Sequence, residues 1–529
     1  MSSDCLSFKD TRRFSKLIED YSDSHPDLES FFHRPFHPDS FAPQMIEKAA
    51  NFPFDHRNIL VEVLKEQYAD LTVSSKTSAN IDALGSLETF TVTTGHQLNL
   101  FSGPLYFWYK IIDTIKLAAH LSTTHGKIVV PVFWMATEDH DFEEINHFYV
   151  QDQPIQWKGF NLGPVGRRDT TGIEPVLDLL KRTLKPGING EYLISLFERS
   201  YQNHSNLSSA TRYLVNELFG EDGLVILDAD HPKLKTLFLP FLREELLQQT
   251  SFEKIEKTSE KLSEHYHKQV NPRPLNLFCL TQNSRVRIER LDNGFVSSGP
   301  NYKWSEEELL NEMELHPERF SPNALLRPLY QEVVLPNLCY VGGGAEIAYW
   351  LQLKSYFGSQ NIVFPILKIR NSALLVSKQQ QQKWEKLGLS GKDFLRPLKE
   401  LTDEFALKSG ESRPDFRGLY EQLDRQFRIL KTHAEATDPS FMSAVEAQLS
   451  KQNKGLKNLE KRWLRAQNKM HFQSIQRIEG QYHEVNPSGK MQERHLNFAS
   501  FYNEFGTKFK SQLQESIDPM TQGFYIIAL

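Results

Sequence analysis

Residues 88–135 constrain the fold of this 529-residue chain more than any other segment. Phe90 to Thr94 is rich in β-branched residues and predicts a short strand. Leu105 to Leu121 has apolar residues at helical spacing, and Gly126 predicts the end of that helix. Ile128 to Met135 is almost wholly apolar, as expected for a strand buried on both faces in the middle of a parallel sheet. The segment therefore predicts a βαβ unit and an α/β fold.

Three later segments predict further strands of the same sheet. Each apolar run ends in polar or glycine residues: Leu224 to Leu227, Val333 to Val341 before Gly342, and Ile362 to Ile369 before Arg370. Residues 1–375 are thus predicted to form a Rossmann-like core. Residues of about 150–215 and 265–320 are predicted insertions, the second with a hairpin turn at Asp292-Asn293-Gly294.

The composition changes after about residue 376 towards Gln, Lys, Glu and Leu. One apolar series recurs every seven residues, which predicts a coiled coil: Met442, Leu449, Leu456, Trp463 and Met470. With the preceding helix, about 413–435, the simplest arrangement is a long antiparallel α-helical hairpin, and about 40 residues would reach roughly 60 Å. The hairpin either mediates dimerisation or packs only on its own core. Residues 376–485 are predicted to form this domain, and 486–529 to return to the core.

Bulk properties exclude several classes of protein. A net charge of −6 argues against a nucleic-acid binder. The three cysteines contain no CxxC pair, which argues against a disulfide framework or a cysteine zinc site. No apolar run approaches the ~18 residues of a membrane span. The first residues lack the pattern of a secretory signal. We therefore expect a cytoplasmic protein without a membrane partner.

The first segment with functional chemistry follows the strand that ends near Thr94. Backbone N–H groups at the start of the next helix are predicted to bind an anion. His96 offers a proton-transfer group, although a hydrogen-bonded structural histidine is the alternative. The predicted binding residues of this segment are Thr94, Gly95, Gln97, Asn99, Ser102 and Gly103.

The second segment is Glu138-Asp139-His140-Asp141, directly after the apolar strand. Clustered carboxylates around a histidine shift one another's pKa values, which suits acid–base work or cation binding. Exposed charge runs are otherwise usually solvated surface. Spacing alone does not support a dedicated protein metal site, although Mg²⁺ could accompany a nucleotide.

The third segment places three glycines, Gly342, Gly343 and Gly344, between a strand and a helix that carries Glu346 and Tyr349. Glycines allow a ligand to approach the backbone closely, and a tight turn is the alternative. The segment lacks the Gly-Lys-Ser/Thr ending of a Walker A loop. Candidate anion partners and their neighbours are Lys110, Lys368, Arg370, Asn371, Ser372 and Arg494.

Five stretches carry a family resemblance: TTGHQLNLFSGPLYFWYKIIDTIKLA (93–118), VVPVFWMATEDHDFEEINHF (129–148), RPLYQEVVLPNLCYVGGGAEIAYWLQLK (327–354), FPILKIRNSALLV (364–376) and PSGKMQERHLNF (487–498). Together they resemble the cysteine-adding enzymes, or cysteine ligases, of bacillithiol biosynthesis. The resemblance implies a Rossmann-like core with connecting-peptide insertions, a protruding coiled coil and a homodimer. It also implies the last biosynthetic step, in which L-cysteine joins glucosaminyl malate through an amide bond.

The implied chemistry needs an activated carboxylate, so ATP or ADP with Mg²⁺ is the expected cofactor, and no structural metal is expected. Under this interpretation His96, Asp139 and His140 are the catalytic residues, and Glu138 and Asp141 assist binding. His140 or Asp139 would deprotonate the amine, while His96 would stabilise developing negative charge. The malate carboxylates would meet Arg370, Arg494 or Lys110. The alternatives are a catalytically inactive nucleotide-binding or regulatory protein of the same fold, and a scaffold that acts through its coiled coil.

Overall fold

The computed structural model describes residues 4–159, 163–281, 283–299, 302–409 and 414–529. The chain divides into two compact units, which are described separately below. The first contains Met1–Val376 and Lys490–Leu529, and the second contains Ser377–Gly489. Among the described helices, none is both long and apolar enough to cross a membrane.

A five-stranded parallel sheet forms the centre of the first unit, in the order β13-β12-β2-β3-β6. Its strands are β2 (Thr89–His96), β3 (Ile128–Met135), β6 (Val225–Asp228), β12 (Asn337–Gly342) and β13 (Ile366–Ile369). Helix α6 (Tyr106–His125) connects β2 to β3 and packs against both. The predicted βαβ unit and the Rossmann-like parallel sheet are confirmed.

The starts of two predicted strands are wrong. Val333 and Val334 lie in helix α14 (Arg327–Val334), and β12 begins only after Pro336. An apolar run does not distinguish a buried helix from a strand, and α14 is buried along most of its length. Likewise, β13 begins after Pro365 rather than at Ile362, because proline cannot donate to the sheet ladder.

The first insertion lies between β3 and β6. It contains helix α7 (Phe142–Ile145) and a hairpin of β4 (His147–Val150) and β5 (Gln153–Gln156). Three helices complete it: α8 (Glu174–Thr183), α9 (Ile188–Tyr201) and α10 (Leu207–Phe219). The insertion therefore extends the core mainly with helices.

The second insertion lies between β6 and β12. After α11 (Pro232–Gln248) and α12 (Thr250–Ser263) it forms a five-stranded antiparallel sheet, in the order β10-β9-β8-β7-β11. These strands are β7 (Leu277–Leu280), β8 (Arg285–Leu291), β9 (Gly294–Ser297), β10 (Lys303–Trp304) and β11 (Phe320–Pro322). Leu291 pairs with Gly294, so the predicted hairpin turn is confirmed.

The C-terminal part of the first unit holds a second small sheet. Strand β15 (Phe524–Ala528) lies between β1 (Asp4–Leu6) and β14 (Ser372–Val376). Short helices precede β15: α22 (Gln492–His495), α23 (Ala499–Phe505) and α24 (Lys508–Ser516). The side-chain amide of Gln492 accepts from the N–H of Leu375 at 2.8 Å and donates to its carbonyl at 3.0 Å. This contact fixes α22 beside β14.

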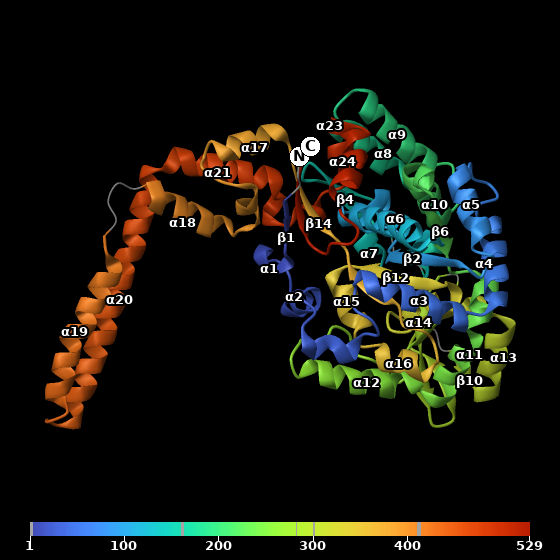
Figure 1. The fold of residues 1–529 in the computed structure, drawn as a ribbon, viewed down its shortest axis with the longest axis horizontal. Helices are drawn as coiled ribbons and strands as arrows, with labels where there is room; N and C mark the ends of the chain where they lie inside the picture. The colour runs from blue at the N-terminus through green and yellow to red at the C-terminus, as the bar shows by residue number, and fades with distance from the viewer. Residues whose placement is uncertain (1–3, 160–162, 282, 300–301, 410–413) are drawn as a thin grey trace. The chain divides into compact units, whose positions relative to one another are not determined.

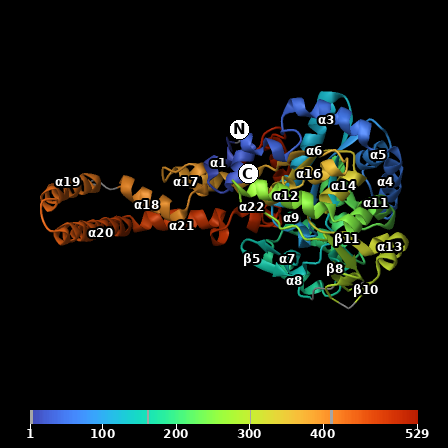
Figure 2. The same ribbon diagram turned by 90° about the horizontal axis from the view of Figure 1, so that it is seen from below.

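The second unit is helical and contains the predicted hairpin. Helices α19 (Phe416–Ala434) and α20 (Pro439–Met470) lie side by side in both views (Figures 1 and 2). They are antiparallel, since Tyr420 contacts Glu460 and Lys431 contacts Glu446. Asp438 caps α20 by accepting from the N–H of Ser440 at 2.8 Å.

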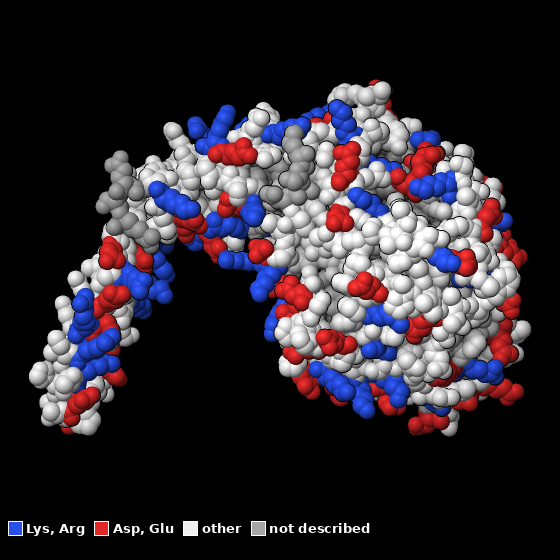
Figure 3. Space-filling model, in the orientation of Figure 1, with Lys and Arg blue, Asp and Glu red and all other residues white. Residues whose placement is uncertain are grey.

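The heptad series of α20 is buried only in part. Met442 and Leu449 pack against a small core of Phe427, Ala434 and Val445, whereas Met470 is 76% exposed. Lysines, arginines and acidic residues are interspersed along α19 and α20, with uncharged side chains between them (Figure 3). The predicted start of the first helix, near residue 413, lies outside the described residues.

Candidate active site

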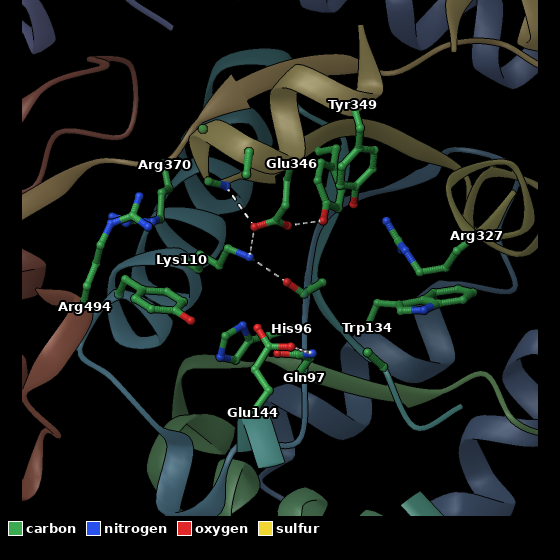
Figure 4. A pocket seen from close by; sticks show the side chains of 17 residues that line it. His96, Gln97, Lys110, Trp134, Glu144, Arg327, Glu346, Tyr349, Arg370 and Arg494 are labelled. Atoms are coloured by element: carbon green, nitrogen blue, oxygen red, sulfur yellow. Dashed lines mark hydrogen bonds and ion pairs between the residues drawn. The ribbon is translucent and has the colours of Figure 1, made fainter. Parts of the chain in front are cut away.

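A cavity of about 460 Å³ lies at the carboxyl ends of β2, β3 and β12, where ligands bind in open parallel sheets (Figure 4). Its lining includes ten residues that the sequence predicted: Gly95, His96, Gln97, Lys110, Gly343, Gly344, Glu346, Tyr349, Arg370 and Arg494. The remaining lining residues are Tyr106, Trp134, Ala136, Glu144, Arg327, Tyr340 and Ala345. The cavity is therefore the candidate active site.

His96 is a buried, neutral group in the cavity wall. Its side chain packs against the rings of Tyr106 and Phe107, and Nε2 has no partner among the described residues. Burial lowers its pKa well below the usual value, and the nearby charges of Lys110 and Arg370 lower it further. His96 is therefore suited to hydrogen-bond a ligand as a neutral imidazole.

Two backbone N–H groups at the start of α6, where the sequence predicted an anion site, are not available to an anion. The N–H of Leu105 donates to the carbonyl of Leu496 at 2.9 Å, and the N–H of Phe107 donates to Pro104 at 3.1 Å. These groups are therefore already used within the chain.

Three residues of the connecting loop, Asn99, Ser102 and Gly103, do not line the cavity. Gly103 has φ +63°, and a Cβ there would lie 2.6 Å from the Cβ of Asn99. Glycine at this position is therefore a packing requirement of the loop. Thr94 is also structural, since its hydroxyl donates to the carbonyl of Val341 at 2.7 Å.

Lys110 and Glu346 form an ion pair at the centre of the site. Lys110 Nζ contacts the Glu346 carboxylate and donates to the carbonyl of Gly95 at 2.8 Å. Glu346 also accepts from the N–H of Gly343 at 3.1 Å and from the Tyr340 hydroxyl at 2.5 Å. Burial would raise the pKa of Glu346, but Lys110 and these hydrogen bonds lower it. The Gly342 to Gly344 turn thus positions Glu346, while Gly342 itself does not line the cavity.

The side chains of the acidic segment after β3 contact different partners. Glu138 contacts Lys235, which is 1% exposed, and Asp141 caps α7 through the N–H of Glu144. Asp139 accepts from Gln97 Nε2 at 2.9 Å, and His140 accepts from Arg285 at 3.3 Å. Glu138, Asp139, His140 and Asp141 do not line the cavity, whereas Glu144 does and accepts from Gln97 at 2.9 Å.

Asp139 is held in its ionised form. Burial would raise its pKa, but hydrogen bonds from His140 and Gln97 and the charge of Arg285 lower it well below the usual value. Such a carboxylate is a poor proton acceptor and a good anchor for Gln97. Within the described ranges, no three His, Cys, Asp or Glu side chains are placed to hold a metal ion.

Arg370 lies in the cavity wall but is neutralised by the chain. It donates to both oxygens of Glu493 at 3.0 and 2.7 Å, and to the hydroxyl of Ser372 at 3.0 Å. Asn371 turns away and donates to Asp113, which also pairs with Lys368 at 2.9 Å. Lys368 is fully buried in this contact, so its prediction as an anion partner is wrong.

Sequence reasoning missed residues whose position depends on tertiary contacts. Arg327 begins α14 and lies before the apolar run from Val333 that was interpreted as a strand. Arg285 comes from the second insertion and contacts Asp139 at 3.5 Å. Glu144 belongs to the acidic run after β3, and its place in the wall depends on the fold of α7. The sequence feature that these three residues share is a charged side chain beside an otherwise apolar or ordered element.

Comparison with known proteins places the chain in a family. Residues 1–371 match the "Bacillithiol biosynthesis BshC, N-terminal Rossmann-like domain", and residues 373–529 match the "C-terminal coiled-coil domain" of BshC. A protein of Campylobacter jejuni titled "putative arginyl t-RNA synthetase" covers 80% of this chain and 100% of its own, at 10% identity, but the TM-score is only 0.21.

Curated relatives carry the printed name "Putative cysteine ligase BshC". The relative from Flavobacterium johnsoniae is 44% identical over 100% of both chains. That from Christiangramia forsetii is 44% identical over 100% of this chain and 99% of its own. The relative from Bacillus cereus is 27% identical over 94% of this chain and 95% of its own. The chain therefore belongs to the BshC family of bacillithiol biosynthesis.

Proposed function

We propose that this chain is a ligase that joins the carboxyl group of L-cysteine to the amine of glucosaminyl malate, the last step of bacillithiol biosynthesis. The names of the relatives support the ligase class. The observation that carries the substrate proposal is the cavity wall, which combines Lys110, Arg327, Arg370 and Arg494 with Glu144 and Glu346. Cations suit the carboxylates of both substrates, and carboxylates suit their amines.

The geometry favours Glu144 as the group that takes the proton from the attacking amine. Glu144 is exposed and lines the cavity, and Gln97 holds its carboxylate at 2.9 Å. Asp139 and His140 lie outside the lining, so they act in this proposal by orienting Gln97. His96, as a neutral imidazole, would hydrogen-bond the oxygen on which negative charge develops.

A carboxylate and an amine do not condense spontaneously in water, so we also propose a requirement for ATP with Mg²⁺. Three backbone N–H groups at this edge are already used within the chain. That of Gly343 donates to Glu346, and those of Leu105 and Phe107 donate to carbonyls. In this proposal side chains of the cavity hold the nucleotide, and the proton transfer above uses only residues of this chain.

The test is reconstitution with the purified protein, L-cysteine, glucosaminyl malate and Mg²⁺, with and without ATP. Mass analysis should show the amide product only in the complete mixture. Cells that lack the protein should accumulate glucosaminyl malate without bacillithiol. Binding of both substrates without turnover would instead support an inactive or regulatory member of the family.

We further propose a cytoplasmic homodimer. The three cysteines, Cys5, Cys279 and Cys339, are all described and free, which fits a reducing compartment. The hairpin of α19 and α20 leaves Ile429, Phe441 and Leu459 exposed, and a second copy could cover them. Light scattering on the purified protein should give the dimer mass, and Leu459→Glu should lower it towards the monomer.

A further inference from the structure

The cavity wall holds two carboxylates, Glu144 and Glu346, that differ in their partners. Glu144 accepts a hydrogen bond from the neutral amide of Gln97 at 2.9 Å, whereas Glu346 forms an ion pair with Lys110. Under the proposed function the substrates bring two amines, of which one reacts and the other does not. The two carboxylates are therefore suited to different amines.

Three donors of the chain bind the Glu346 carboxylate, which can accept about four hydrogen bonds. Lys110 Nζ and the N–H of Gly343 contact Oε1, and the Tyr340 hydroxyl donates to Oε2 at 2.5 Å. Among the described residues, Oε2 has no second donor. The side chain is partly exposed in the cavity wall. One acceptor position of Glu346 is therefore left for a donor of a ligand.

Lys110 carries the opposite charge and joins two elements of the cavity wall. Its ammonium group contacts Glu346 on helix α15 (Gly344–Trp350) and donates to the carbonyl of Gly95 near the end of β2 at 2.8 Å. His96 follows Gly95 directly, and the charge of Lys110 acts on its imidazole. In Figure 4 the ion pair lies in the middle of the cavity, between the arginines on either side. A carboxyl group held at Lys110 would therefore lie centrally and close to His96.

An ion pair of this kind is complementary to a zwitterion. A free amino acid carries its ammonium and carboxylate groups on one carbon atom, so the first can donate to Glu346 while the second accepts from Lys110. A ligand with only one of these charges would leave one member of the pair facing a like charge or none. Burial would raise the pKa of Glu346, but Lys110 and the hydrogen bonds lower it, so Glu346 takes no proton from the ammonium group.

We propose that Lys110 and Glu346 recognise the amino-acid substrate as a zwitterion, with its α-ammonium group on Glu346 and its carboxyl group on Lys110. This inference rests on the proposed function and names the site of one substrate. The carboxyl group then lies in the middle of the cavity, where the amine of the second substrate can reach it. An ammonium group has no lone pair with which to attack, so the amino acid held in this way cannot act as its own nucleophile.

Calorimetric titration with L-cysteine and 3-mercaptopropionate tests the contact with Glu346. The second compound has the same thiol and carboxylate but no ammonium group. The wild-type protein should bind L-cysteine with a dissociation constant about tenfold or more below that of 3-mercaptopropionate, given the usual strength of hydrogen bonds to charged groups. Glu346→Gln should reduce this preference to about twofold or less, and Glu346→Asp should keep part of it. The matched variant Glu144→Gln should leave the preference unchanged.

Two outcomes of this titration would overturn the proposal. One is an unchanged preference in Glu346→Gln, and the other is a wild-type protein that binds both compounds equally. If Glu346→Gln fails to fold, Glu346→Asp decides, because a shorter carboxylate should still weaken the preference.

Cysteamine tests the contact with Lys110, since it has the thiol and the ammonium group but no carboxylate. The wild-type protein should bind L-cysteine about tenfold or more tightly than cysteamine. Lys110→Gln should lose most of this preference and keep the preference over 3-mercaptopropionate, whereas Glu346→Gln should show the reverse pattern. An unchanged preference over cysteamine in Lys110→Gln would contradict the contact. If that variant fails to fold, the pattern in Glu346→Gln decides.

These titrations need neither ATP nor the second substrate nor turnover, so this inference and the proposed function can fail separately. Preferences that follow the two residues, without amide product in the complete mixture, support zwitterion recognition and contradict the ligase. Amide product without these preferences supports the ligase and contradicts zwitterion recognition.

Discussion

Two buried lysine–carboxylate pairs share helix α6 and differ in their surroundings. Lys368 and Asp113 are both 0% exposed at 2.9 Å, and Asp113 also accepts two hydrogen bonds from Asn371. One turn earlier, Lys110 is 2% exposed, but its partner Glu346 is 24% exposed in the cavity wall. The closed pair can serve only the fold, whereas the open pair can exchange partners with a ligand.

The largest expected effect is on the closed pair. Asp113→Ala leaves Lys368 buried without its partner, and loss of one member of a buried pair typically costs about 3–5 kcal/mol. We expect a drop of that size in the free energy of unfolding, measured with denaturant. A loss of unfolding free energy below about 1 kcal/mol, the typical contribution of one hydrogen bond, would mean that the Lys368–Asp113 pair is not shielded from solvent.

The open pair should affect activity more than stability. Glu346→Gln keeps an acceptor for Gly343 and Tyr340 but removes the charge that faces Lys110. We expect product formation to fall about 100-fold, the usual cost of removing one preorganised polar group at a reacting centre. The midpoint of unfolding should fall less than in Asp113→Ala. The distinction between the open and closed pairs would be contradicted if Asp113→Ala and Glu346→Gln lost equal stability while Glu346→Gln kept its activity.

His96 in the cavity wall should make the free energy of unfolding depend on pH. The pKa of His96 is lower in the folded than in the unfolded state, so below about pH 6.5 the unfolded chain binds a proton that the folded chain does not. Its contribution to stability is present above that pH and is lost as the pH falls, by at most about 1.4 kcal/mol per unit. His96→Gln should flatten the loss measured between pH 7.5 and 5.5. An unchanged slope would contradict the lowered pKa.

An exposed pair should give the smallest effect. Arg417 and Glu421 lie 3.1 Å apart on α19, with side chains 90% and 58% exposed. Glu421→Ala should change the free energy of unfolding by no more than about 0.5 kcal/mol, because solvent screens such pairs. The loss of unfolding free energy in Glu421→Ala is the baseline for the losses measured at the two buried pairs. A larger loss would show that the pair takes part in an interaction beyond its own helix.

The sequence predicts local elements better than it predicts which charges face one another. The βαβ unit from Thr89 to Met135 and the start of α20 at Asp438 follow from periodicity and capping, which are local. The strand start at Val333 failed because apolar runs do not separate helix from strand, and the start at Ile362 failed because Pro365 cannot donate to the sheet ladder.

The candidate site shows the same limit. Strand ends correctly placed His96 and Gln97 in the cavity wall, since parallel strands end at one edge. The partners of Lys368 and Arg370 lie 255 and 123 residues away in sequence, so no local pattern could reveal that they are neutralised. Arg327 was missed for the same reason.

The order of synthesis gives the C-terminal contacts of the first unit a further consequence. Glu493 and Arg494 follow the helical second unit in the chain, so a ribosome completes Ser377–Gly489 before it makes them. Strand β15, which joins β1 to β14, comes later still. At about 5–20 residues per second, the nascent core waits several seconds with Arg370 unneutralised and the cavity wall incomplete. The site can therefore be completed only after the helical second unit has been synthesised.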